Sequence, residues 1–352
     1  MEKEEWMTLD TAFERRSLPL NEPFAIARGT QAIAENVFVS VTDGAGRTGI
    51  GGAAPSGHYG ETGETVTALL PELLAVVEES GDPHALARIE RNVRGVVRGN
   101  PAARCAVSIA LHDLLGKRLD LPLYRYWGLD PAATVETSYS VGLGSTEEMA
   151  ETAAAAVADG FSILKVKLGT DRDREIVAAI RGAAPEATVR VDANEAWTPR
   201  EAIRKIDALE THGVEFVEQP VSAEDPRGLR FVHERAALPI AADESCVTLA
   251  DVPRVAERAD VAVIKLMKCG GLREAIRMIH TARAHGLEVM LGCMVESNAS
   301  IAAAAHLAPL LDYADLDGSL LLADDPYAGV RIAGGEIDLG GLARAGTGVR
   351  ER

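Results

Sequence analysis

The chain has 352 residues and a formal net charge of −17, an acidic balance that disfavours nucleic acid and anionic membrane surfaces as partners. Its hydrophobic content of 47% and charged content of 25% are ordinary for a globular protein, and no apolar run approaches the ~20 residues of a membrane span. The four cysteines lack metal-ligand spacing and the acidic N-terminus lacks the apolar core of a signal peptide, so we expect reduced thiols in a cytoplasmic protein.

Residues 1–125 are predicted to form an α+β domain. Apolar and polar side chains alternate at 36–42, which is typical of a β-strand, and the turn residues 43–46 indicate that a hairpin follows. Apolar residues then recur at helical spacing over 61–79 and 102–117.

Residues 126–319 alternate between strand-like and helix-like segments. Eight candidate strands end near Val141, Lys167, Asp192, Glu218, Asp243, Lys265, Leu291 and Asp315, with seven helical stretches between them. This alternation predicts a parallel sheet with helical crossovers, and it is typical of a (β/α) barrel, whose chemistry lies at the C-terminal ends of the strands. Residues 320–352 are rich in glycine and lose the pattern, so we expect them to return to the N-terminal domain.

Lys165 and Lys167 stand on one candidate strand, separated by a single residue, so both side chains lie on the same face. The residues on the other face, Leu164 and Val166, are apolar and suit the outside of a barrel covered by helices. The lysines should therefore face the lumen, although a solvated edge strand protected by lysines is the alternative. Mutual repulsion and desolvation are expected to lower the pKa of a lysine in such a pair, so that it can act as a base.

Three acids, Asp192, Glu218 and Asp243, end three consecutive candidate strands. Counted from Lys167, the steps through these acids to Lys265 are 25, 26, 25 and 22 residues. A single acid at such a position is more often a helix N-cap or a surface charge, but three in equivalent positions favour a shared cation. Because no histidine or cysteine accompanies them, the oxygen ligands select Mg²⁺ or Mn²⁺.

Two further pairs of charged residues follow. Lys265 continues the inward face of its strand, whereas Lys268 falls in the loop after it and is either a substrate contact or a solvated residue, the second being our preferred interpretation. Asp315 and Asp317 again share one face at the last strand. They either belong to a turn or bind the ammonium group of a substrate.

In combination, these motifs resemble the muconate-lactonizing subgroup of the enolase superfamily. The shared motifs are K-x-K at Lys165–Lys167, D-A-N at Asp192–Asn194, E-Q-P at Glu218–Pro220, A-D-E-S at Ala242–Ser245 and K-x-x-K-x-G-G at Lys265–Gly271. The segments Asp315–Gly318, Gly292–Met294 and Pro23–Gly29 are similar to those of dipeptide epimerases, especially L-Ala-D/L-Glu epimerases. The resemblance implies an α/β fold, a (β/α)7β modified TIM barrel (126–319) with an N-terminal α+β capping domain (1–125) that 320–352 completes.

The resemblance also implies a reaction and a set of roles. The reaction is the Mg²⁺-dependent epimerisation of an L,L-dipeptide at the α-carbon of its C-terminal residue, with Mn²⁺ as an alternative metal. The implied roles are metal binding for Asp192, Glu218 and Asp243; proton transfer for Lys167 and Lys265, with Lys165 tuning Lys167; binding of the dipeptide ammonium for Asp315 and Asp317; binding of a glutamate side chain for Arg28; and support of the metal ligands for Asn194 and Glu244.

Other activities within the subgroup are less favoured. An N-acylamino-acid racemase, an o-succinylbenzoate synthase or a muconate cycloisomerase handles substrates without a free ammonium group, so Asp315 and Asp317 argue against them. A catalytically silent binding barrel should have lost acids or lysines that this chain keeps. The sequence leaves the oligomeric state open.

Two residues bear on specificity. Gly52 stands where related sequences usually carry the acid of a G-x-G-E motif, close to the loop expected to close the pocket with Arg28. Glu296 follows the seventh candidate strand, and it would repel an acidic substrate side chain if it faced the pocket. Residues 49–54 also contain a weak dinucleotide-binding pattern, which we reject because Pro55 stands where a helix should begin.

Overall fold

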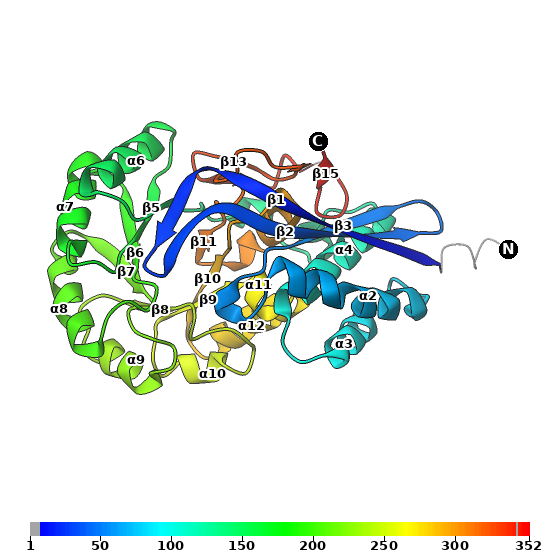
Figure 1. Cartoon of the computed structure of the whole chain (residues 1–352), viewed down its shortest axis with the longest axis horizontal. Helices are drawn as coiled ribbons and strands as arrows, with labels where there is room; N and C mark the ends of the chain where they lie inside the picture. The colour runs from blue at the N-terminus through cyan, green and yellow to red at the C-terminus, as the bar shows by residue number, and fades with distance from the viewer. Residues whose placement is uncertain (1–7, 343) are drawn as a thin grey trace.

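The computed structural model describes residues 8–342 and 344–352 (Figure 1). A three-stranded antiparallel sheet with its helices lies beside an eight-stranded parallel sheet surrounded by helices. This is the predicted α/β fold, a barrel with an N-terminal α+β domain.

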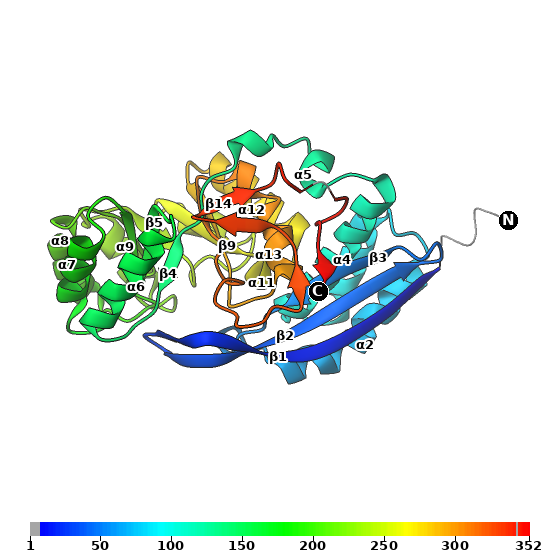
Figure 2. The same cartoon turned by 90° about the horizontal axis from the view of Figure 1, so that it is seen from above.

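The N-terminal sheet has the order β1 (Leu9–Ile26), β2 (Gly29–Asp43) and β3 (Thr48–Ala53). The predicted hairpin joins β2 to β3, and Asp43 Oδ1 accepts hydrogen bonds from the backbone N–H groups of Ala45 and Arg47 in its turn. The ribbon of β1 and β2 is long, and its turn extends to the mouth of the barrel (Figure 2).

Two helices pack on this sheet, α2 (Gly63–Ser80) and α4 (Pro101–Leu119), and α3 (Leu86–Val96) packs on these two helices. α4 packs directly on β3, because a Cβ atom added at Gly49 would lie only 2.0 Å from the carbonyl oxygen of Ala110. Gly51 is equally close to Ala106. The glycines of the weak dinucleotide pattern therefore serve close packing of a helix on a strand.

Eight parallel strands form the barrel in consecutive order, and an isolated bridge between Thr137 and Ala314 closes it. The strands are β4 (Tyr139–Val141), β5 (Ile163–Lys167), β6 (Thr188–Asp192), β7 (Val214–Glu218), β8 (Ile240–Ala242), β9 (Val261–Lys265), β10 (Glu288–Gly292) and β11 (Tyr313–Asp315). Six of the predicted strand ends coincide with these, and two differ by one residue.

Helices connect successive strands on the outside of the barrel. They are α6 (Thr146–Ala158), α7 (Asp173–Ala183), α8 (Pro199–Glu210), α9 (Pro226–His233), α10 (Val252–Val255), α11 (Leu266–Cys269), α12 (Leu272–Ala284) and α13 (Asn298–Ala305). α8 begins with the reciprocal hydrogen bonds of a capping box between Thr198 and Glu201. α11 is a short extra turn that follows β9 directly.

The C-terminal segment packs on the N-terminal sheet. Leu322 forms an antiparallel bridge with Leu20, and β12 (Tyr327–Ala328) pairs with β15 (Arg350–Glu351). The ring of Tyr327 contacts that of Phe38 on β2 in a tilted arrangement, with 4.7 Å between the ring centroids. These contacts support the proposal that residues 320–352 complete the N-terminal domain.

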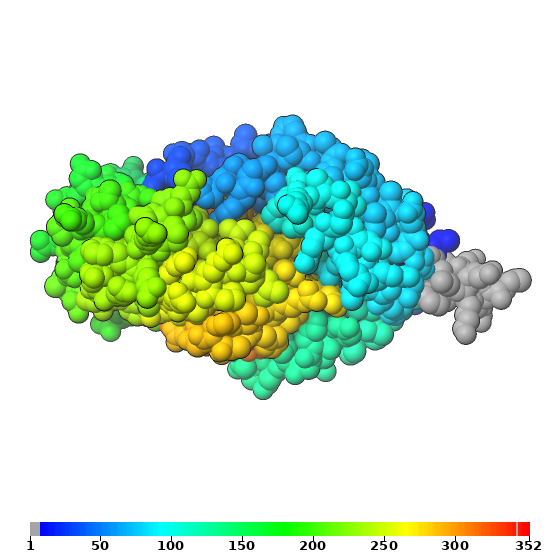
Figure 3. All heavy atoms as spheres, turned by 90° about the horizontal axis from the view of Figure 1, so that it is seen from below, coloured from blue at the N-terminus to red at the C-terminus, as the bar shows by residue number. Residues whose placement is uncertain are grey.

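The two parts of the molecule are in close contact. Figure 3 shows α2 and α3, in blue and cyan, packed against the yellow and orange segments that follow β8. Among the residues that the structure describes, none of the helices has both the length and the apolar character needed to cross a lipid bilayer.

Candidate active site

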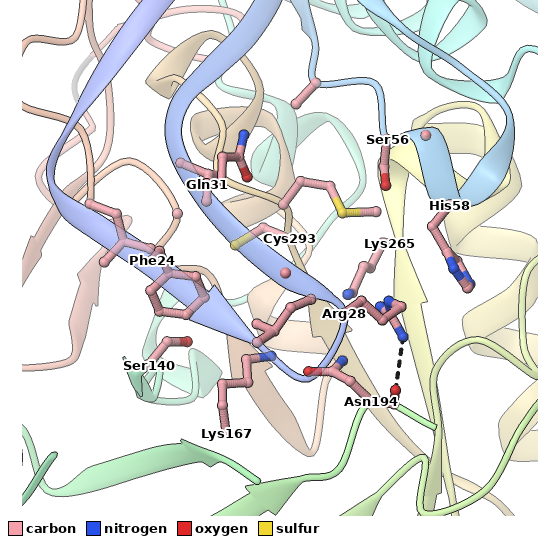
Figure 4. A pocket seen from close by; sticks show the side chains of 18 of the residues that line it. Phe24, Arg28, Gln31, Ser56, His58, Ser140, Lys167, Asn194, Lys265 and Cys293 are labelled. Carbon is pink, nitrogen blue, oxygen red and sulfur yellow. Dashed lines mark hydrogen bonds between the residues drawn. The ribbon is translucent and has the colours of Figure 1, made fainter. Parts of the chain in front are cut away.

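A cavity of about 550 Å³ lies between the C-terminal ends of the barrel strands and the N-terminal domain. Its wall combines the turn of the β1–β2 ribbon, the loop at 54–59 and side chains from the barrel. Figure 4 shows Lys167 and Lys265 extending into this space from different parts of the barrel, and Arg28 also lines it.

The lysines of β5 lie inside the barrel. Lys165 Nζ donates to Glu218 Oε1 at 2.9 Å and to Asp315 Oδ2 at 2.8 Å, and Lys167 Nζ donates to Asp192 Oδ2 at 2.7 Å. Both lysines line the cavity although their side chains are almost entirely buried.

The expectation of a lowered lysine pKa is wrong for Lys165. Desolvation by burial lowers the pKa of its ammonium group, but the carboxylates of Asp315 and Glu218 outweigh this effect and raise the pKa well above its ordinary value. The pKa of Lys265 is also raised, because the carboxylate of Asp243 outweighs desolvation. The expectation considered only the neighbouring lysine, which would lower the pKa. The fold of the barrel places carboxylates close to Lys165 and Lys265, and these raise the pKa.

The three predicted metal ligands are buried at neighbouring strand ends. Asp192 and Glu218 are paired in register on β6 and β7, and Asp243 directly follows β8. Lys165 Nζ lies 3.6 Å from Asp192 and 2.9 Å from Glu218, so its ammonium group stands between these two acids.

The surroundings of Glu218 suit a divalent cation. Desolvation and the charge of Asp192 raise the pKa of its carboxyl to about 8. Its Oε2 atom is buried and accepts no hydrogen bond of good geometry from the described residues, although Lys165 lies nearby. A hard divalent cation with oxygen ligands would satisfy this atom and reduce the repulsion between the acids, so the residues fit Mg²⁺.

Asp243 is held by two lysines. Lys265 Nζ donates to Asp243 Oδ2 at 2.8 Å, and Lys268 Nζ donates to Asp243 Oδ1 at 2.5 Å and to the carbonyl oxygen of Val263 at 3.0 Å. Lys268 is only 1% exposed, so its interpretation as a solvated residue is wrong. The reason is α11, which begins at Leu266 and turns the Lys268 side chain back to the barrel.

Asn194 and Glu244 lie beside the acids as expected. Asn194 donates from its backbone N–H to Asp192 Oδ1 at 2.9 Å and from Nδ2 to Asp192 Oδ2 at 3.1 Å. Its φ of 44° is left-handed, an uncommon conformation for a residue with a side chain that is found mainly where the surroundings enforce it. Glu244 Oε1 lies 3.4 Å from Asn194 Nδ2.

Gln219 supports the site in a way that the sequence does not reveal. Its Oε1 accepts hydrogen bonds from the backbone N–H groups of Asp243 and Ser245, and its Nε2 donates to the carbonyl oxygen of Val221. It too is left-handed, with φ of 35°. The E-Q-P motif marks this position, but only the fold shows that Gln219 ties the ends of β7 and β8 together.

Asp315 and Asp317 both line the cavity. Asp315 accepts from Ser138 Oγ at 2.7 Å, and Asp317 accepts from the backbone N–H of Ser140 at 2.6 Å. Desolvation raises the pKa of both, but Lys165 reverses the effect for Asp315 and lowers its pKa to about 2. For Asp317, desolvation and the charge of Asp315 raise the pKa to about 7.

Arg28 occupies the turn between β1 and β2 and reaches the barrel. Its Nη2 lies 2.7 Å from Glu244 Oε1, and its Nη1 donates to the carbonyl oxygen of Asn194 at 3.1 Å, the dashed line of Figure 4. Nη1 also donates to Glu195 Oε2 at 3.3 Å. The guanidinium group is therefore neutralised by two acids of the barrel while it lines the cavity.

Two residues considered for specificity do not line the cavity. Glu296 is buried, and its Oε1 accepts a hydrogen bond from the backbone N–H of Met294 at 2.9 Å, so it is not placed to repel a substrate side chain. A Cβ atom added at Gly52 would lie 3.3 Å from Ala299 of α13, so the position faces that helix.

A second cluster, His58, Glu195 and Glu244, was not predicted. These residues offer ligand atoms within 4.8 Å of one another, the one set of three histidines, cysteines or acids that converges so closely in the part of the chain described. The guanidinium of Arg28 already lies among them and supplies the positive charge. Asp192, Glu218 and Asp243 are instead each bound to lysines.

Comparisons with known proteins agree with this geometry. Residues 9–128 match the mandelate racemase / muconate lactonizing enzyme N-terminal domain, and residues 148–349 match the enolase C-terminal domain-like family. An L-Ala-D/L-Glu epimerase of Bacteroides thetaiotaomicron is 37% identical over 330 residues, which cover 94% of this chain and 85% of the relative.

Two solved structures are close in fold. The dipeptide epimerase of Enterococcus faecalis V583, complexed with Mg and the dipeptide L-Leu-L-Tyr, superposes with a TM-score of 0.91 at 34% identity, covering 97% of this chain and 99% of that one. A substrate-liganded L-Ala-D/L-Glu epimerase of Bacillus subtilis has a TM-score of 0.92 at 33% identity, covering 97% and 98%.

Proposed function

Because the chain belongs to the mandelate racemase and muconate lactonizing enzyme family, we propose that it is a Mg²⁺-dependent dipeptide epimerase that inverts the α-carbon of the C-terminal residue. One observation carries the proposal: Lys167 on β5 and Lys265 on β9 enter the same cavity, each paired with a different acid. A single base returns a proton to the face that it left. Two amines on opposite faces allow removal from one side and delivery to the other.

Proton transfer and metal binding are assigned to separate residues of the site. Lys167 Nζ removes the α-proton from the L-residue, and Lys265 Nζ delivers a proton to the opposite face; the roles exchange in the reverse direction. The raised pKa of Lys265 keeps its ammonium protonated and ready to donate. Mg²⁺ held by Asp192, Glu218 and Asp243 would act as a Lewis acid toward the substrate carboxylate, chemistry that is general for this superfamily.

Substrate recognition is proposed from the charges at the cavity wall. Asp317, with Asp315 beside it, accepts hydrogen bonds from the dipeptide ammonium, which favours a free N-terminus over an N-acyl group. Arg28 keeps N–H donors beyond those used by Glu244, Asn194 and Glu195, since a guanidinium has five. These donors favour an acidic side chain at the inverted residue, so L-Ala-L-Glu is the preferred substrate.

The proposal is tested with a library of L,L-dipeptides in D₂O and mass-spectrometric detection of deuterium uptake. We expect uptake of one deuteron at the C-terminal residue together with inversion there, most rapidly for L-Ala-L-Glu. The absence of uptake for every dipeptide in the presence of Mg²⁺ would contradict the assignment. Uptake only with N-acylated amino acids would replace it with an N-acylamino-acid racemase.

We also propose a cytoplasmic location from the cysteines. All four are free thiols, and three of them are buried. Burial raises the pKa of Cys246 and Cys269 to about 12, so these thiols stay protonated and unreactive. Free thiols of this kind are typical of reducing compartments.

A further inference from the structure

Glu195 is fixed rigidly to the barrel. It follows β6 with a left-handed φ of 71°, and its backbone N–H donates to the carbonyl oxygen of Gln219 at 2.9 Å. Its side-chain Oε1 accepts from the backbone N–H of Ala223, beyond β7, at 2.7 Å. A glutamate in this conformation is costly, and the two bonds to the loop that follows β7 hold it there.

The other carboxylate oxygen of Glu195 faces the N-terminal domain. Glu195 Oε2 lies 3.3 Å from Arg28 Nη1 and 3.5 Å from His58 Nε2. Arg28 comes from the β1–β2 turn and His58 from the short helix Gly57–Tyr59, two separate segments of the cavity wall. Figure 4 shows both side chains on the same side of the cavity, with Asn194 below Arg28.

We propose that Glu195 is a positioning residue that holds two N-terminal loops, 24–31 and 55–60, against the barrel, a role that we call the clasp. In this way Glu195 fixes the orientation in which Arg28 meets the substrate side chain. One carboxylate oxygen is anchored to the barrel and the other lies close to a side chain of each loop, so its loss removes one contact from both loops at once. Arg28 would keep Glu244 but lose one of the two acids that hold it. The effect on substrate selection rests on the proposed function, whereas the effect on the loops does not.

A metal ion is a poorer occupant of this cluster. His58, Glu195 and Glu244 have the nitrogen and oxygen donors that a divalent cation accepts. The Arg28 guanidinium, however, lies 2.7 Å from Glu244 and 3.3 Å from Glu195, where it would repel such an ion. The negative charges of Glu195 and Glu244 are already balanced by the guanidinium of Arg28, which belongs to the N-terminal domain. These ion pairs link the N-terminal domain to the barrel, as the clasp requires.

The test uses the full chain with Glu195→Gln, which keeps the size of the side chain but removes its charge. Glu224→Gln, at an exposed glutamate of the next loop, is the matched control. Hydrogen exchange measured by mass spectrometry without substrate should be faster for Glu195→Gln in the peptides that cover 24–31 and 55–60. His58→Gln should accelerate exchange only at 55–60.

Kinetics supply the second readout. For Glu195→Gln, KM for L-Ala-L-Glu should rise about tenfold, as expected for one lost charge-assisted hydrogen bond, with a much smaller change in kcat. KM for L-Ala-L-Leu should change less, because Arg28 does not bind that side chain.

The outcomes separate the two proposals. Exchange and KM equal to those of wild type and Glu224→Gln would overturn the clasp, as would faster exchange spread evenly over the whole chain. Faster exchange confined to the two loops, in a protein that epimerises no dipeptide, would leave the clasp standing and reject the proposed function.

Discussion

Lys165 Nζ lies 2.8 Å from Asp315 Oδ2 and thereby joins the first half of the barrel to its last strand. The same ammonium group lies 2.9 Å from Glu218, one of the expected metal ligands. A single buried cation therefore links an acid expected to bind metal to an acid expected to bind the substrate ammonium. Its positive charge balances both groups of acids, so we expect Lys165 to be structural as well as catalytic.

Replacing Lys165 with Met should destabilise the fold. Removing one partner of a buried ion pair leaves uncompensated charge, and the cost is typically about 3–5 kcal/mol. Urea unfolding at pH 7 measures the loss. The double variant Lys165→Met/Asp315→Asn should recover part of it, and fully additive effects would show that the two side chains are not coupled.

Metal removal should abolish activity. Three buried carboxylates at neighbouring strand ends predict a cation, and EDTA should therefore stop epimerisation until Mg²⁺ or Mn²⁺ is added. Mg²⁺ should also raise the melting temperature, because it binds the folded state alone. The Glu218→Gln variant should lose this thermal shift. Full activity in a preparation verified as metal-free would refute the metal site.

Each of the two opposing lysines should be essential. Lys167→Ala and Lys265→Ala are each expected to reduce epimerisation by at least ~10²–10⁴, the usual contribution of one acid–base group. Each variant should still exchange the α-proton of one stereoisomer with D₂O, and the two should differ in which one. NMR of the substrate α-proton distinguishes these cases. A Lys265→Ala enzyme that epimerises at nearly the wild-type rate would refute the two-base assignment.

Substrate binding should depend on pH through Asp317. Desolvation and Asp315 raise the pKa of Asp317 to about 7, so its carboxyl is neutral below this pH and charged above it. Only the charged form pairs strongly with an ammonium group, and KM for a free dipeptide should therefore rise as the pH falls below about 7. KM should rise again above ~8, where the dipeptide amine itself loses its proton. Asp317→Asn should remove the rise of KM at low pH. If this rise persists in the variant, another group causes it.

Lys268 should control metal affinity without touching the substrate. Its ammonium group donates to Asp243 and to the carbonyl oxygen of Val263, so it orients one expected metal ligand. We expect Lys268→Met to weaken Mg²⁺ binding by about 10- to 100-fold, as for other residues that support ligands. Titration calorimetry of Mg²⁺ with the metal-free protein is the direct measurement. Unchanged Mg²⁺ affinity in a folded variant would reject this role.

The sequence predicts the barrel well because its signals are local. Alternation around Lys165 and Lys167 gives the strand and its inward face, and Thr198 marks the start of α8. The environment of Lys268 could not be predicted, since it depends on the helical turn that follows Lys265. The contacts of Arg28 join residues 166 or more positions apart, and no spacing rule reaches that far.

The contact between the N-terminal sheet and the C-terminal segment has a consequence for the order in which the protein folds during its synthesis. Leu20 on β1 pairs with Leu322, and the ring of Phe38 on β2 contacts that of Tyr327, so the N-terminal sheet lacks these partners until the segment after the barrel has been made. Contacts at such separation form late and slowly. The barrel can assemble beforehand, but the N-terminal wall of the cavity gains these contacts only after residues 320–328 have been made.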